Sequence, residues 1–274
     1  MRNVKEYLRK DIMPLIWCPG CGNGQVTKYL IKAVDELGLD KNKVVVVSGI
    51  GCSSRLPGYL DFHTMHTIHG RALAFATGIK FANPELTVFV ITGDGDASAI
   101  GGNHFIHAAR RNIDINMIMV NNNIYGMTGG QYSPTTPEKT IARTSPYGLI
   151  EKPFDMMELA KGAGATFAAR TTTYHFTAGK NYIKKAVQHK GFSLVEFVSQ
   201  CPTYFGKFTG IPNPNDMMNY FKNNSVPLSK AKDMSEDELK GKIVTGIFID
   251  SNDRKEYCDA YEEVIAAAKG GERI

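Results

Sequence analysis

Two short polar sequences each follow an apolar run that predicts a buried strand. GDGD at residues 93–96 comes after the run at 87–91, and NNN at residues 121–123 comes after the run at 117–120. Because parallel strands end at the same edge of a sheet, a carboxylate and a carboxamide should meet there. Such oxygens, together with a backbone carbonyl, suit a hard divalent cation that leaves positions open for phosphate. The glycines beside the aspartate also let the backbone approach a diphosphate closely. The pattern predicts a magnesium–diphosphate site; two ordinary polar turns are the alternative.

Four of the five cysteines form a second group. Cys18 and Cys21 make a C-x-x-C pair, whereas Cys52 and Cys201 each follow a predicted strand. Thiolates in this number suit zinc or an iron–sulfur cluster. The wide spacing favours a cluster held between loops of a preformed fold, and buried core thiols are the alternative for the two single cysteines. Cys258 has no companion, so we expect it to pack in the core.

Three histidines recur at every third position: His63, His66 and His69. Side chains at this spacing do not share one face unless the segment is a tight turn. We therefore do not expect these three histidines to form a metal site. His69 stands just before a predicted helix. We expect it to donate a hydrogen bond to a phosphate oxygen, with helix capping as the alternative.

Strand-like apolar runs alternate with helix-length amphipathic segments along most of the chain. The runs predicted as strands are residues 43–48, 87–91, 117–120, 166–169 and 193–198. The predicted helices are residues 25–37, 70–81, 102–111, a helix closing at 159–163, and 178–189. Continuous apolar strands joined by helices predict an α/β fold, with a doubly wound parallel sheet covered on both faces. The candidate ligands would then all lie at one edge of this sheet.

The last seventy residues break this alternation. Residues 206–233 are rich in proline and asparagine and predict a long irregular arm, ordered by a partner or wrapped over the site. Its apolar residues have no predicted element to bury them. Two helices are expected after the arm, at residues 235–240 and 256–269, and a disordered tail is the alternative.

Composition excludes several classes of protein. Hydrophobic residues make up 43% of the chain and charged residues 22%, as in ordinary globular proteins. No apolar run is long enough to span a bilayer, and residues 1–10 are charged without an apolar signal core, so we expect a cytoplasmic protein. The net charge of +5 comes without a dense run of Lys and Arg, which argues against nucleic acid but would favour an acidic protein partner. A P-loop is absent, and GIG at residues 49–51 is not completed to a dinucleotide fingerprint.

Together the motifs resemble a known family. CPGCG, GIGCSSR, HTIHGR, GDGD, NNNIYGMTGGQYSPTTP and a single late cysteine occur in order over residues 14–205. In this respect the chain resembles the beta subunit of 2-oxoacid:ferredoxin oxidoreductases. The resemblance implies a thiamine-diphosphate-binding α/β domain with an iron–sulfur cluster in residues 1–205. Residues 206–274 would form the arm and the helices that contact a partner.

The resemblance also implies the residues of each site. Cys18, Cys21, Cys52 and Cys201 would ligate one four-iron four-sulfur cluster. Magnesium would be bound by the side chains of Asp94 and Asn122 and by the carbonyl of Ile124. Thiamine diphosphate would contact Ile50, Gly51, Cys52, Ser53, His69, Gly95, Asp96, Gly126 and Met127. The catalytic glutamate that activates the cofactor would lie on a partner alpha subunit. Apart from the resemblance, Arg55 is the basic residue nearest the predicted site and is a candidate contact for a substrate carboxylate, with a salt bridge to the partner as the alternative.

The implied reaction is the oxidative decarboxylation of a 2-oxoacid with coenzyme A. It yields an acyl-CoA and CO2, passes electrons through the cluster to ferredoxin, and is reversible in principle. The sequence YGMTGGQYSPTTP looks most like members that use 2-oxoglutarate; members specific for branched-chain 2-oxoacids or pyruvate are alternatives. A non-redox thiamine-diphosphate-dependent decarboxylase and an electron-transfer module without cofactor chemistry are the rival functions.

Overall fold

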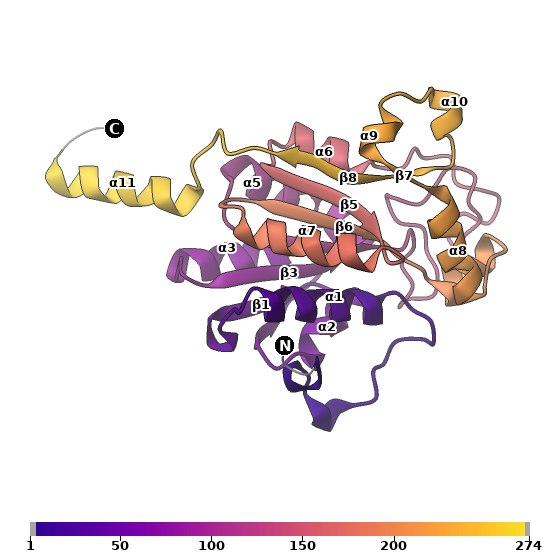
Figure 1. Cartoon of the computed structure of the whole chain (residues 1–274), viewed down its shortest axis with the longest axis horizontal. Coiled ribbons are helices and arrows are strands. Elements are labelled where there is room, and N and C mark those ends of the chain that lie inside the picture. The colour runs from indigo at the N-terminus through magenta and orange to yellow at the C-terminus, as the bar shows by residue number, and fades with distance from the viewer. Residues whose placement is uncertain (1–3, 272–274) are drawn as a thin grey trace.

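A single mixed sheet organises the chain. The computed structural model describes residues 4–271, and within them eight strands pair in the order β2-β1-β3-β4-β6-β5-β8-β7 (Figure 1). The strands are β1 (Val44–Ser48), β2 (His63–His66), β3 (Thr87–Gly93), β4 (Asn116–Asn121), β5 (Phe167–Thr172), β6 (Ser193–Val198), β7 (Ser225–Pro227) and β8 (Ile243–Asp250). The strands from β2 to β5 in this order are parallel, whereas β8 pairs with β5 in the antiparallel direction. The predicted α/β fold with a parallel sheet is confirmed.

Helices cover both faces of the sheet (Figure 1). One face packs against α1 (Asn23–Glu36) and α7 (Phe176–Gln188), and the other against α3 (Ala72–Ala82), α5 (Gly102–Arg111) and α6 (Met156–Gly162). Within β1, Val44 and Val46 belong to one core cluster and Val45 and Val47 to the other. Both faces of the strand are buried, which explains why it is continuously apolar rather than alternating.

The prediction of an irregular arm at residues 206–233 was wrong. This segment contains α8 (Pro214–Asn224), β7 and α9 (Leu228–Ala231). Proline and asparagine, interpreted as breakers, start α8 instead: Pro214 occupies its first turn and Asn213 caps it by accepting a hydrogen bond from Asn215 N at 2.8 Å. Met217 and Phe221, spaced one helical turn apart, are buried on this helix. The two helices expected after the arm correspond to α10 (Glu236–Leu239) and α11 (Tyr257–Gly270).

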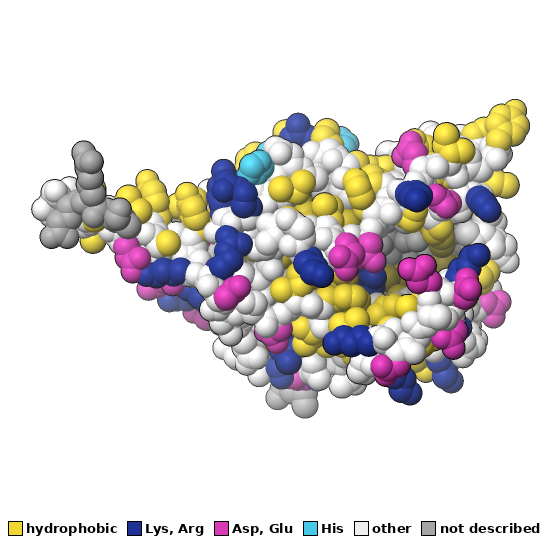
Figure 2. Space-filling model, turned by 90° about the horizontal axis from the view of Figure 1, so that it is seen from above, with side chains coloured by type: hydrophobic (Ala, Val, Ile, Leu, Met, Phe, Trp, Pro, Cys, Tyr) yellow, Lys and Arg dark blue, Asp and Glu magenta, His cyan; other side chains and the backbone are white. Residues whose placement is uncertain are grey.

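Helix α11 projects from the body of the protein (Figure 1). Its first turn is anchored, because Cys258 is buried in one of the two core clusters, as expected for a cysteine without companions. Figure 2 shows hydrophobic side chains along one side of the projecting helix and charged side chains along the other. Tyr261 and Val264 are among the exposed apolar residues. Among residues 4–271, no helix combines the length and the apolar character that crossing a membrane requires.

Candidate active site

The predicted cofactor residues meet at the carboxyl ends of β1 and β3. These strands are neighbours, but the chain leaves β1 toward β2 on one side and continues from β3 toward β4 on the other. Open parallel sheets bind ligands at such a switch in strand order. A cavity of about 130 Å³, here called the cofactor cavity, lies at this point. Every residue predicted to contact thiamine diphosphate lines it, as do Asp94, Asn122 and Ile124.

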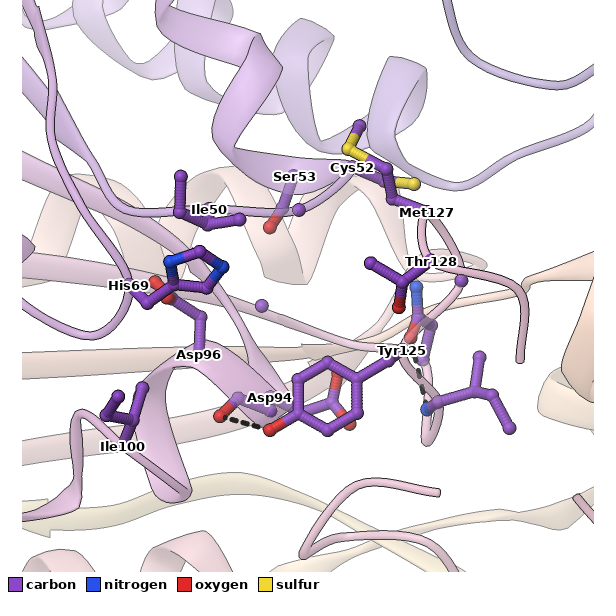
Figure 3. A pocket seen from close by; sticks show the side chains of 16 residues that line it. Ile50, Cys52, Ser53, His69, Asp94, Asp96, Ile100, Tyr125, Met127 and Thr128 are labelled. Atoms are coloured by element: carbon purple, nitrogen blue, oxygen red, sulfur yellow. Dashed lines mark hydrogen bonds between the residues drawn. The ribbon is translucent and has the colours of Figure 1, made fainter. Parts of the chain in front are cut away.

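Figure 3 shows how these side chains face one another. Ile50 and Ser53 lie on one side of the cofactor cavity, Asp94 and Tyr125 lie on the opposite side, and the ring of His69 is near Asp96. The sequence did not single out three lining residues: Ile100, Tyr125 and Thr128. They are an isoleucine, a tyrosine and a threonine in loops, with no pattern that marks them for a ligand.

Asp94 is a buried carboxylate at the start of the short helix α4 (Asp94–Ser98). Its side chain is 2% exposed, and its Oδ2 accepts hydrogen bonds from the hydroxyls of Ser133 at 2.5 Å and Thr135 at 2.7 Å. Burial raises the pKa of Asp94, and these hydrogen bonds act in the opposite direction. None of the ion pairs formed by residues 4–271 includes Asp94. A buried anion without a cationic partner is costly, so this carboxylate suits a bound metal ion.

The turn after β4 supplies the other two candidate ligands. Asn122 Oδ1 accepts a hydrogen bond from Ile124 N at 3.3 Å, which closes a tight turn beside the cavity. Asn123 between them has a φ of 60°, a left-handed conformation that asparagine tolerates better than most residues. Asp94, Asn122 and Ile124 thus line one cavity. Carboxylate, carboxamide and backbone carbonyl oxygens, which these residues carry, are donors that magnesium prefers.

Asp96 lines the cofactor cavity, but its carboxylate ties loops together. Oδ1 accepts a hydrogen bond from Gly70 N at 2.7 Å, and Oδ2 accepts one from the Thr92 hydroxyl at 3.0 Å. A Cβ at Gly49 would lie 2.0 Å from Oδ2, so the loop after β1 passes close enough to require glycine there. Burial raises the pKa of Asp96. Its carboxylate therefore joins the loops that form one wall of the cavity.

Tyr125 explains why Gly95 cannot carry a side chain. The Tyr125 hydroxyl donates to the Gly95 carbonyl at 3.0 Å, and a Cβ at Gly95 would lie 2.3 Å from the ring. Burial raises the pKa of Tyr125 to about 12, so the phenol is neutral at physiological pH. This glycine is required for packing as well as for the approach of a ligand.

The four predicted cluster cysteines line a second cavity, of about 280 Å³, here called the cysteine cavity. Cys18 is exposed and Cys201 is buried. Trp17 fixes the first loop to the second by donating from its indole nitrogen to the Cys52 carbonyl at 2.7 Å. Burial raises the pKa of Cys52 to about 12 and also raises the pKa values of Cys21 and Cys201. Within residues 4–271 no three His, Cys, Asp or Glu side chains are grouped tightly enough for a single metal ion.

The two cavities share a wall. Cys52, Asn122, Gly126 and Met127 line both of them. A Cβ at Gly126 would be 3.5 Å from Cys201 Sγ and 3.9 Å from Cys52 Sγ. The partition between the cofactor cavity and the cysteine cavity is therefore only one residue thick at this point.

A buried polar network, missed by sequence reasoning, supports the turn after β4. Asn121 Oδ1 accepts hydrogen bonds from Asn123 N at 3.1 Å and from Thr135 Oγ1 at 3.0 Å, while its Nδ2 donates to Glu196 Oε1 at 2.7 Å. Glu196 is 1% exposed and pairs with Arg170 on the neighbouring strand. The one available signal was a glutamate inside an otherwise apolar strand, which requires a buried partner.

Other candidates lie outside both cavities. Arg55 is exposed on a 3₁₀ turn and lines neither of them. His63 and His66 belong to the edge strand β2, and His66 Nδ1 lies 3.0 Å from Ser48 Oγ. Of the three histidines, His69 alone lines the cofactor cavity.

Comparison with known proteins agrees with this geometry. Residues 49–197 match the model of the thiamine pyrophosphate enzyme family, C-terminal TPP binding domain. The chain is 53% identical to 2-oxoglutarate synthase subunit KorB of Methanocaldococcus jannaschii over 269 residues, covering 98% of this chain and 99% of the relative. It is 46% identical to the beta subunit of 2-oxoacid:ferredoxin oxidoreductase of Saccharolobus solfataricus over 190 residues, covering 69% of this chain and 62% of the relative.

A solved structure is similar over the whole chain. The 2-oxoglutarate:ferredoxin oxidoreductase from Magnetococcus marinus, with 2-oxoglutarate, coenzyme A and succinyl-CoA bound, superposes with a TM-score of 0.86 at 34% identity. The match covers 100% of this chain and 92% of that one. Fold and site thus define a thiamine-diphosphate-binding oxidoreductase subunit. The chain belongs to the family of 2-oxoacid:ferredoxin oxidoreductase beta subunits. The matched family model is a thiamine pyrophosphate binding domain and these relatives are named oxidoreductases, so neither of the two rival functions fits the chain.

Proposed function

We propose that this chain is the catalytic subunit of a 2-oxoglutarate:ferredoxin oxidoreductase. In the reaction, 2-oxoglutarate, coenzyme A and two oxidised ferredoxins give succinyl-CoA, CO2, a proton and two reduced ferredoxins. The observation that carries the proposal is the shared wall: a cavity suited to magnesium and thiamine diphosphate adjoins one lined by four cysteines. Relatives named for 2-oxoglutarate support the choice of substrate.

Magnesium would be held by Asp94, Asn122 and the Ile124 carbonyl. Asp94 supplies the negative charge, and the hydroxyls of Ser133 and Thr135 hold its Oδ2 in place. The role of these residues is to place a cation where it neutralises a diphosphate.

Thiamine diphosphate would occupy the cofactor cavity. When bound, it supplies the nucleophilic carbon that attacks the 2-oxo group and takes up the electron pair released with CO2. Gly51 and Gly126 let the backbone approach the ligand, and the ring of His69 is available for a phosphate oxygen. Ile50, Ile100 and Met127 form an apolar part of the cavity lining.

An iron–sulfur cluster would occupy the cysteine cavity, bound by Cys18, Cys21, Cys52 and Cys201. The residues fit a cluster because all four thiols surround one space rather than one point. Backbone N–H groups of Tyr204 and Phe205 donate to Cys201, as is usual for thiolates that bind iron. Cys52 borders both cavities, so electrons would have a short path between them.

A partner alpha subunit would complete the site. The carboxylates that line the cofactor cavity are those of Asp94 and Asp96, and both are engaged by other groups. An acid that activates the cofactor must then come from another chain. Apolar residues at the rim are open to such a partner: Ile100 is 53% exposed and Met127 is 46% exposed.

Exposed apolar residues also occur outside the rim of the cofactor cavity. Tyr147 and Ile150, in the loop that follows the cavity-lining residues, are almost fully exposed. The expected partner contact of residues 206–274 would use the apolar side of α11. Ferredoxin would dock near exposed Cys18, and a cytoplasmic location stays a prediction.

The test is an assay of the complex purified anaerobically from its native extract. Reduction of ferredoxin or a viologen dye should require both coenzyme A and 2-oxoglutarate. A preference for pyruvate or a branched-chain 2-oxoacid would overturn the substrate, although not the reaction class. Full activity of the isolated chain would overturn the shared site, and a colourless complex would overturn the cluster.

A further inference from the structure

Asn23 makes an unusual contact beside the cysteine cavity. Its amide Nδ2 donates to Cys21 Sγ at 3.3 Å, and its backbone N–H donates to the same sulfur. The side chain is 1% exposed, and its Oδ1 has no hydrogen-bond partner within the described part of the chain. The contact with sulfur is therefore the hydrogen bond that this buried amide makes.

A neutral thiol is a poor acceptor for a buried amide. Burying an amide without good hydrogen bonds is costly, and a thiol sulfur is only a weak acceptor. A thiolate that binds iron is a much better one, because hydrogen bonds to a charged group are stronger. The position of Asn23 thus makes sense once Cys21 carries negative charge.

Asn23 also begins helix α1, and that position adds to the effect. The partial positive charge at the amino end of this helix lies beside Cys21. Each of these donors stabilises negative charge on the sulfur, and a cluster gains one negative charge when it is reduced. Hydrogen bonds to cluster sulfurs therefore raise the reduction potential.

Two of the other cysteines, Cys52 and Cys201, receive hydrogen bonds from the backbone. Cys201 accepts from Tyr204 N and Phe205 N, and Cys52 from its own N–H. The Asn23 amide is a side-chain donor, so a substitution can remove it without changing the backbone.

We propose that Asn23 sets the reduction potential of the iron–sulfur cluster by donating from its side-chain amide to Cys21. Asn23 is in this sense a positioning and tuning residue, and it does not touch substrate. The inference rests on the proposed function, since it requires the cluster.

The test is a redox titration of the anaerobically purified complex, followed by electron paramagnetic resonance of the reduced cluster. Asn23→Leu keeps the branched shape at Cγ but removes the donor, and Asn23→Ala removes it with less risk of overpacking. Both variants should show a more negative midpoint potential than the wild type, and pulsed measurements in D2O should show the loss of the exchangeable protons of this amide near the cluster.

The matched control is Asn116→Leu. Asn116 is also a buried asparagine whose Oδ1 has no hydrogen-bond partner among residues 4–271, but it lies on β4 and lines neither cavity. Its substitution should leave the potential unchanged.

Two failures can be told apart. A wild-type complex without iron would overturn the proposed function, whereas a loaded Asn23→Leu or Asn23→Ala complex with the wild-type potential would overturn this inference alone. An equal shift in the Asn116 variant would overturn it too, because the effect would then follow from lost stability.

Discussion

The cofactor cavity and the cysteine cavity differ in what supports their candidate ligands. Asp94 and Asn122 directly follow two neighbouring central strands, and short hydrogen bonds hold the groups around them. The C-x-x-C pair, Cys18 and Cys21, stands on a loop whose position depends on distant packing. A Cβ at Gly20 would lie 2.2 Å from Pro214 Cγ, so the C-x-x-C turn rests on the start of helix α8. The metal site should therefore be preformed, whereas the cluster site should depend on the fold of the C-terminal part.

The largest effect is expected for a variant that should lose the cluster from the cysteine cavity and leave the cofactor cavity unchanged. Cys201→Ala should abolish the brown visible absorption and reduction of the acceptor, because a cluster ligand is lost. Binding of thiamine diphosphate, measured by calorimetry with magnesium, should change by no more than about 3-fold, because Cys201 does not line the cofactor cavity. Cys258→Ala, at the buried cysteine outside both cavities, is the control and should keep the iron content. Equal iron loss in both variants would contradict the assignment.

Asp94→Asn should have the opposite effect, because it should impair cofactor binding and leave the cluster in place. The substitution keeps the shape of the side chain and removes the charge, so magnesium-dependent binding of thiamine diphosphate should weaken by at least ~100-fold. Iron content and visible spectrum should stay as in the wild type. Unchanged affinity in calorimetry would show that Asp94 is an ordinary turn residue.

Glu196→Gln should have a smaller effect that reaches the metal site indirectly. Loss of the charge weakens the pair with Arg170 and the hold on Asn121. We expect magnesium-dependent binding to weaken by roughly 10-fold and the free energy of unfolding to fall by about 1–3 kcal/mol. Glu36→Gln is the control, because Glu36 pairs with Lys180 and Lys184 near the surface and should cost below about 1 kcal/mol. Similar binding losses in the two variants would refute the role of the network.

Gly20→Ala probes how far the cluster site depends on α8. Gly20 has a φ of +78° and lies against Pro214, so the variant combines backbone strain with a steric clash. Gly38→Ala at a φ of +64° has open space around it and measures the strain alone, about 1–2 kcal/mol. Iron should be lost on exposure to air faster in the Gly20 variant than in the Gly38 variant. Equal rates would mean that contact with Pro214 does not support the turn.

The smallest difference between the two cavities should lie in how the loading of each depends on pH. Burial raises the pKa values of Cys21, Cys52 and Cys201, so these thiols are protonated at neutral pH and must lose protons to bind iron. Burial also raises the pKa of Asp94, so magnesium binding should weaken as the pH falls. Loading of iron should improve as the pH rises from about 6 to 9 and should depend on pH more steeply than loading of magnesium, because it requires several thiols to lose protons. Reconstitution at several pH values, with iron and bound cofactor measured separately, shows whether iron loading is the more pH-dependent of the two.

Features that lie at the ends of buried strands could be predicted from the sequence, whereas contacts between distant segments could not. The ends of β1, β3, β4 and β6 could be predicted because these strands are apolar runs buried on both faces. The candidate ligands follow these strands in the sequence. Strand β2 was missed because it is a short edge strand with exposed histidines. Strand β8, only half-buried at the other end of the sheet, was missed as well. Ser133 and Thr135 reach Asp94 across about forty residues of chain, and no periodicity encodes such a contact.

The shared wall has a consequence for protein engineering. With the proposed cofactor and cluster bound, a change at Cys52, Gly126 or Met127 would alter the surroundings of both groups at once, so substrate range and electron transfer could not be adjusted independently there. Ile100 and Thr128 line the cofactor cavity alone. A library aimed at new 2-oxoacids should therefore start from those two positions, where selection for a new substrate leaves the electron path intact.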